Sequence, residues 1–163
     1  MLILGADPGS HRTGYGAVET DGRHHRLVEM GVLAPPPRAA LPERLHYLHR
    51  ETAELIARLQ PELMAVEDLF HATNSRSALI LGHVRGVLLL AGVQAGLPIQ
   101  AYAPATVKAQ VTGFGRADKA QVAYMVGRLL GLDADSLTRG DAADALAVAL
   151  CAAHQPAVSG RTA

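Results

Sequence analysis

Four carboxylates occupy positions where their side chains could act together. Asp7 and Glu67 each follow directly after a short apolar run, so each stands at the carboxyl end of a predicted strand. Parallel strands of one sheet end at the same edge, where such sheets bind their ligands. Asp141 and Asp144 lie three residues apart on a predicted helix and therefore project to one side. If that helix packs near the same edge, the four acids converge, and a hard divalent cation such as Mg²⁺ or Mn²⁺ would relieve their repulsion.

Each carboxylate also has a structural explanation, and for any one of them taken singly that explanation is favoured. Asp7 begins an Asp-Pro-Gly sequence, which is typical of a turn. Glu67 could be a solvated strand end, and the adjacent Asp68 is equally acidic. Asp141 and Asp144 could cap a helix or interact with its dipole. The metal-site hypothesis therefore depends on all four acids meeting.

Composition limits the class of protein. A chain of 163 residues with 49% hydrophobic and 18% charged residues is not intrinsically disordered. Its length fits one domain, which we place at 1–154, followed by a flexible tail at 155–163. Cys151 is the only cysteine, which excludes an intramolecular disulfide and a cysteine zinc site. We expect no signal peptide and no membrane span, and therefore a cytoplasmic protein.

Charge is balanced overall but unevenly distributed. Residues 71–130 contain six basic residues and one acidic residue, whereas the remaining residues contain nine basic and fourteen acidic ones. This asymmetry suggests an anion-binding face beside an acidic region. Uneven solvation of helix surfaces explains it as well, and on charge alone that simpler explanation is favoured.

Periodicity and turn residues predict an α/β fold with a mixed five-stranded sheet and helices on both faces. We predict strands at 2–6, 14–20, 26–33, 63–66 and 98–103, and helices at 42–60, 75–95, 104–112, 119–130 and 141–154. Asp21-Gly22 indicates a two-residue hairpin turn. The helix at 75–95 is apolar on almost every side, which predicts a second covering surface such as another subunit, with Val87 or Leu88 at the interface.

Four sequence segments together resemble one known family. They are ILGADPGSHRTGYG at 3–16, AVEDLF at 65–70, GFGRADKAQVAYMV at 113–126 and GDAADALAVAL at 140–150. In this order they resemble the RuvC family of bacterial Holliday-junction resolvases, or crossover junction endodeoxyribonucleases, and the resemblance spans residues 1 to about 154. It implies a ribonuclease H-like fold and a homodimer. The implied activity is paired, symmetric nicking of four-way DNA junctions that depends on Mg²⁺ or Mn²⁺, with the RuvA and RuvB branch-migration proteins as partners.

The resemblance also implies roles for individual residues. The metal-binding catalytic positions, at which two ions are expected, are Asp7, Glu67, Asp141 and Asp144. The DNA-contacting positions are Phe70, Lys108 and Lys119. Two other classes stay open from the residues alone: a nucleotide-binding switch or ATPase of the actin-like type, and a DNA-structure binder without catalysis. Proteins of the actin-like class normally need a second domain to close over the nucleotide. A DNA-structure binder without catalysis has no need for four acids.

Overall fold

The computed structural model describes residues 1–68, 75–133, 137 and 140–155. Its centre is a five-stranded mixed sheet in the order β3-β2-β1-β4-β5. The strands are β1 (Leu2–Asp7), β2 (Thr13–Thr20), β3 (His25–Leu33), β4 (Leu63–Glu67) and β5 (Ile99–Tyr102). β1, β2 and β3 pair antiparallel, whereas β4 runs parallel to both β1 and β5.

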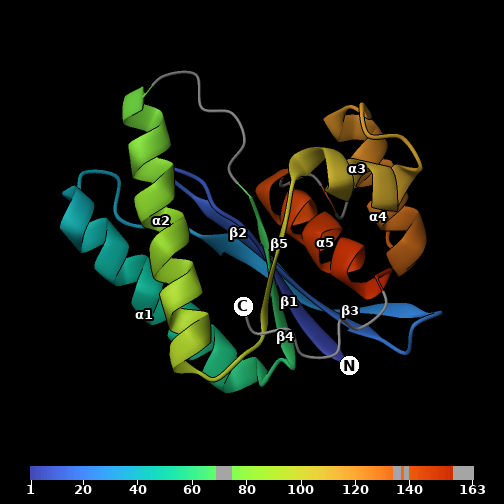
Figure 1. Ribbon diagram of the computed structural model, residues 1–163, viewed down its shortest axis with the longest axis horizontal. Coiled ribbons are helices and arrows are strands. Elements are labelled where there is room, and N and C mark those ends of the chain that lie inside the picture. The colour runs from blue at the N-terminus through green and yellow to red at the C-terminus, as the bar shows by residue number, and fades with distance from the viewer. Residues whose placement is uncertain (69–74, 134–136, 138–139, 156–163) are drawn as a thin grey trace.

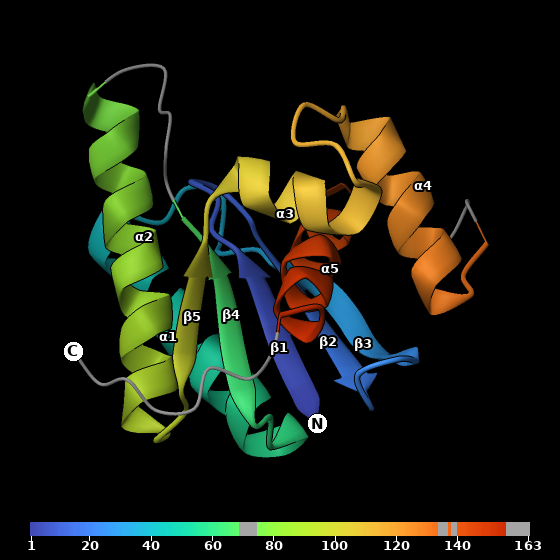
Figure 2. The same ribbon diagram turned by 45° about the vertical axis from the view of Figure 1, so that its right-hand side comes forward.

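Helices cover both faces of this sheet (Figures 1 and 2). The helices are α1 (Leu41–Leu59), α2 (Ser75–Gln94), α3 (Pro104–Thr112), α4 (Lys119–Leu130) and α5 (Gly140–Ala153). α1 and α2 share one buried cluster with one side of the strands, and α3, α4 and α5 share a second cluster with the other side. The predicted fold class is thus confirmed, and the described elements begin and end within one residue of the predicted limits.

Glycines in β1 and β2 allow α5 to lie directly on the sheet. A Cβ atom at Gly5 would collide with the carbonyl oxygen of Ala145, and one at Gly14 would collide with that of Asp141. α5 itself is rich in alanine and buries ten of its residues. Small residues on both surfaces therefore bring the helix and the strands into close contact, and this contact places Asp141 and Asp144 beside the ends of the strands.

The hairpin between β2 and β3 differs from the prediction. Thr20 pairs with His25, so the loop contains four residues, 21–24, instead of two. The Asp21 carboxylate accepts hydrogen bonds from the backbone N–H groups of Arg23 and His24, at 2.8 and 2.7 Å. Gly22 has a φ of 92°. The side chain of Asp21 thus closes a wider loop, which the Asp-Gly pair alone does not reveal.

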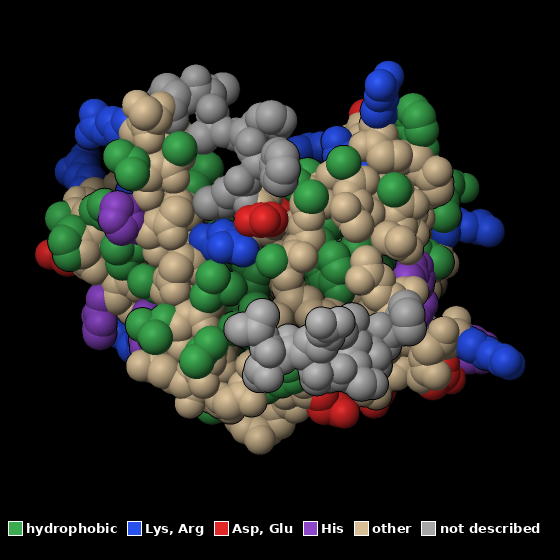
Figure 3. Space-filling view, in the orientation of Figure 1, with side chains coloured by type: hydrophobic (Ala, Val, Ile, Leu, Met, Phe, Trp, Pro, Cys, Tyr) green, Lys and Arg blue, Asp and Glu red, His purple; other side chains and the backbone are tan. Residues whose placement is uncertain are grey.

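α2 leaves a large apolar surface uncovered. Leu79, Leu90 and Val93 are 65%, 49% and 63% exposed, and Figure 3 shows hydrophobic side chains along this outer surface. By length and composition alone, α2 could cross a membrane, so the expectation that no stretch of the chain could do so is wrong. Arg85 interrupts the apolar run, but the helix as a whole remains apolar. The prediction that the sheet cannot cover this helix is confirmed.

Candidate active site

Two carboxylates meet at one edge of the sheet. β1 and β4 are parallel neighbours with Ala6 opposite Val66, so Asp7 and Glu67, the next residue on each strand, end side by side. Their side chains share a hydrogen bond. Because the two strands start in register at Ile3 and Leu63, this meeting follows directly from the sheet topology.

A cavity of about 230 Å³ opens at this edge. α5 contributes Asp144, the first turn of α4 contributes Lys119, and α3 contributes Lys108. The full lining consists of Asp7, Glu67, Pro104, Val107, Lys108, Lys119, Val122, Asp144 and Ala147. Elements that are far apart in the sequence thus bring three acids and two lysines around one space.

The acids are crowded enough to change their protonation. Burial, with the neighbouring charges of Glu67 and Asp144, raises the pKa of Asp7 from 3.8 to about 8, although Lys119 acts in the opposite direction. Burial also raises the pKa of Glu67, while the hydrogen bond from Asp7 opposes that rise. At neutral pH the Asp7 carboxyl therefore keeps a proton and donates it in a hydrogen bond to the Glu67 carboxylate.

Two cations neutralise the acids of α5. Lys119 Nζ lies 2.7 Å from Asp144 Oδ2, and this contact raises the pKa of Lys119. Arg12 Nε lies 3.4 Å from Asp141 Oδ2. Asp141 does not line the cavity, and among the described residues no three acidic, histidine or cysteine side chains are grouped closely enough to hold one ion. The pairing of Asp141 with Arg12, in the loop after β1, was not predicted from the sequence.

The donor set nevertheless suits a hard divalent cation. Asp7, Glu67 and Asp144 offer only carboxylate oxygens, which are the ligands that Mg²⁺ and Mn²⁺ prefer. Burial and, after it, the neighbouring carboxylates Glu67 and Asp144 raise the pKa of Asp7, so negative charge is unfavourable at this place. A cation that displaced the Asp7 proton and replaced Lys119 as the partner of Asp144 would offset the repulsion among these carboxylates.

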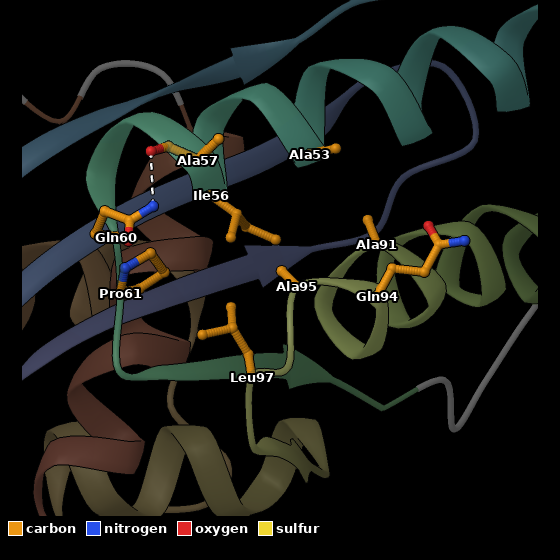
Figure 4. A pocket seen from close by; sticks show the side chains of 9 residues that line it. All are labelled: Ala53, Ile56, Ala57, Gln60, Pro61, Ala91, Gln94, Ala95 and Leu97. Carbon is orange, nitrogen blue, oxygen red and sulfur yellow. Dashed lines mark hydrogen bonds between the residues drawn. The ribbon is translucent and has the colours of Figure 1, made fainter.

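A second hollow, of about 370 Å³, lies between α1 and α2 and carries no comparable chemistry. Figure 4 shows its lining: Ala53, Ile56, Ala57, Gln60, Pro61, Ala91, Gln94, Ala95 and Leu97. None of these side chains titrates, and most are small and apolar. The acidic edge of the sheet is therefore the better candidate for catalysis.

Comparison with known proteins agrees with this location. The family model described as "Crossover junction endodeoxyribonuclease RuvC" matches residues 3–152, which include every residue of the cavity. The chain belongs to the RuvC family. Its members are crossover junction endodeoxyribonucleases that resolve Holliday junctions, so the predicted activity class is confirmed and the actin-like alternative is not supported.

Relatives of similar length share much of the sequence. A RuvC protein of Halorhodospira halophila is 54% identical over 93% of this chain and 89% of its own. One of Pelotomaculum thermopropionicum is 49% identical over 94% and 93%. The structure of Thermus thermophilus RuvC in complex with a Holliday junction substrate is 36% identical, with a TM-score of 0.87 over 93% and 92% of the two chains. The fold is accordingly the RuvC variant of the ribonuclease H-like fold.

The predicted site residues divide into three groups in the structure. Asp7, Glu67, Asp144, Lys108 and Lys119 meet around the cavity. Asp141 lies one turn before Asp144 on α5 and pairs with Arg12. Phe70 lies outside the described residues.

Proposed function

We propose that this RuvC-family protein is a metal-dependent endonuclease that cuts four-way junctions by paired, symmetric nicks in strands of like polarity. The observation that carries the proposal is the meeting of Asp7, Glu67 and Asp144 with Lys108 and Lys119 around one cavity. A DNA-structure binder without catalysis would gain nothing from acids crowded enough to keep a proton on Asp7 at neutral pH.

The carboxylates serve as the metal-binding, catalytic residues. Asp7, Glu67 and Asp144 offer their oxygens to Mg²⁺ or Mn²⁺, and Asp141 joins them when Arg12 leaves it. Two such ions, when bound, would activate a water molecule and stabilise the leaving oxygen of the scissile phosphodiester. As a ligand, Asp7 would give up its proton, and the close contact between α5 and the strands would keep the acids in place.

The lysines serve to bind the DNA backbone at the same place. Lys119 stands in the first turn of α4, where a cation opposes the helix dipole but a phosphate is attracted. Lys108 projects into the cavity from α3. A DNA phosphate that accepts a hydrogen bond from Lys119 would release Asp144 from its ion pair with that lysine. DNA binding and the assembly of the carboxylates are therefore linked through the Lys119 side chain.

Lys108→Ala and Lys119→Ala are each expected to weaken junction binding. If each lysine contacts one phosphate, the slope of log K against log salt becomes shallower by about one unit. Fluorescence anisotropy over a salt series in Ca²⁺ or EDTA measures this slope. Arg50→Ala, on α1 and paired with Glu51, is the matched control that should leave the slope unchanged. An unchanged slope for both lysine variants would make them ordinary surface residues.

The exposed apolar face of α2 supports a homodimer, as the proposed paired nicking requires. Leu79, Leu90 and Val93 lie on this face and are exposed. Of the two positions suggested from the sequence, Leu88 is buried within the subunit and Val87 packs against the same core cluster. The interface test therefore moves to Leu90 and Val93.

Leu90→Arg is expected to convert the dimer to a monomer, because it buries one unpaired charge on each side of the two-fold axis. Sedimentation velocity at micromolar concentration measures the change. Val28→Arg, on β3, is an exposed apolar control that should remain dimeric. A wild-type protein that sediments as a monomer at that concentration would refute the dimer.

Three further parts of the proposal rest on the family. Phe70 would contact an unpaired base at the junction centre, by aromatic stacking. The RuvA and RuvB branch-migration proteins would be partners, and the site of action would be the cytoplasm.

A cleavage assay on a synthetic four-way junction tests the proposed function. In Mg²⁺ or Mn²⁺ we expect nicks at symmetric positions in two opposite strands, and no nicks in EDTA. Cleavage that persists in EDTA would contradict the metal dependence. Tight junction binding without nicking in either metal would support the non-catalytic alternative.

A further inference from the structure

We propose that Arg85 of α2 is a positioning residue for cleavage, which holds Asp68 and thereby fixes the end of β4 that carries Glu67. The inference rests on the proposed function of Glu67 as a metal-binding residue. Arg85 and Asp68 form an ion pair, and neither residue lines the cavity. Their role in the reaction would therefore be indirect, through the position of Glu67.

The ion pair is partly withdrawn from solvent. Arg85 Nη2 lies 3.3 Å from Asp68 Oδ1, and the arginine side chain is only 23% exposed. Its Nε atom is buried and has no hydrogen-bond partner among the described residues. A guanidinium in this environment depends strongly on its carboxylate, because removal of one partner leaves a poorly solvated charge. The Asp68 side chain is 44% exposed, so the pair lies at the boundary between the interior and solvent.

The helix that carries Arg85 is fixed relative to β4. Val84 and Leu88 lie on either side of Arg85 in the sequence and are each 1% exposed. Both belong to the buried cluster that contains Met64 and Val66 of β4. Arg85 thus projects from a helix that shares its buried cluster with the strand that carries Glu67.

A backbone hydrogen bond also holds Asp68. Its backbone N–H donates a 2.8 Å hydrogen bond to the carbonyl oxygen of Tyr102, and Glu67 is paired with the same residue of β5. The residue directly after Glu67 is thus attached to β5 through its backbone and to α2 through its side chain. Loss of the side-chain contact would let the strand end move, and Glu67 would no longer keep its place beside Asp7.

Single-turnover cleavage of a pre-bound junction tests this role. We expect Arg85→Met and Asp68→Asn each to slow cleavage roughly ten- to a hundredfold, since small displacements of reacting groups have effects of this size. The dissociation constant for the junction should stay near the wild-type value, and the Mg²⁺ concentration that gives the half-maximal rate should rise. The double variant should be no slower than either single variant, because both remove the same contact. Arg85→Lys, which keeps the charge, should recover part of the rate.

Arg50→Met is the matched control, because it breaks an exposed arginine ion pair on α1 and should leave the cleavage rate unchanged. Weaker binding with a shallower salt slope in Arg85→Met but not in Asp68→Asn would overturn the proposal in favour of a direct DNA contact. If Arg85→Met and Asp68→Asn melted at a lower temperature but cleaved at the wild-type rate below the unfolding transition, the ion pair would have only a structural role. Additive losses in the double variant would show that the two residues act separately. Absence of cleavage by the wild type and Arg50→Met would instead refute the proposed function, and this proposal with it.

Discussion

Asp7→Asn is expected to lower the rate of junction cleavage in Mg²⁺ at least about a thousandfold, which corresponds to a loss of about 4 kcal/mol in transition-state stabilisation. Glu67→Gln, Asp141→Asn and Asp144→Asn should have similarly severe effects. Each change removes a charged oxygen that the proposed site needs and keeps the shape of the side chain. Junction binding should stay near wild type, since the lysines that attract the phosphates are unchanged.

The control for this series is Glu54→Gln, an exposed carboxylate on α1 that should leave cleavage intact. Single-turnover gel assays measure the rates, and circular dichroism checks the fold. Near-wild-type cleavage by Asp7→Asn would refute the assignment of the site. If only Asp141→Asn cleaved at a near-wild-type rate, Asp141 alone would be excluded from the proposed metal-binding residues. That result would agree with its contact with Arg12 outside the cavity.

The same Asp7→Asn variant is expected to be more stable than the wild type in EDTA. The pKa of Asp7 rises from 3.8 to about 8 on folding, so ionisation of this group favours the unfolded state. The resulting destabilisation is absent below about pH 4, grows as the pH rises, and is complete above about pH 8. One unit of pKa corresponds to about 1.4 kcal/mol, so ionisation of Asp7 would destabilise the folded state by several kcal/mol. The amide introduced by Asp7→Asn does not ionise, and the variant would avoid this destabilisation.

Thermal melts in EDTA at pH 4.5 and pH 8 measure this difference. The melting temperatures of the two proteins should be close at the lower pH. At the higher pH the variant should melt several degrees above the wild type, since 1 kcal/mol shifts a domain of this size by about 2–4 °C. Asp133→Asn, which removes a carboxylate outside the cavity, is the control and should melt close to the wild type. A variant that melts below the wild type at pH 8 would mean that the carboxylate stabilises the fold.

Much of the fold is determined by local features of the sequence. The apolar runs that end at Asp7 and Glu67, Pro42 near the start of α1, and the Asp118–Gln121 capping box before α4 each act over a few residues. The same local patterns place Asp7 and Glu67 at strand ends and Asp141 and Asp144 on one helix. Four motifs in order were enough to indicate the family. The carboxylates could therefore be predicted as candidates, and Asp7 and Glu67 as neighbours at one sheet edge, but the contacts of Asp141 and Asp144 could not.

Only the tertiary structure decided which groups meet, because those contacts join residues far apart in the chain. The close approach of α5 to Gly5 and Gly14 brings Asp144 to the cavity, and long-range packing then pairs it with Lys119 and pairs Asp141 with Arg12.

The apolar composition of α2 predicted an uncovered surface, but it could not distinguish Leu88 from Leu90. That distinction depends on the side of the helix that packs against the sheet. The charge state of Asp7 is likewise a tertiary property, because burial and two neighbouring carboxylates, on β4 and α5, set its pKa.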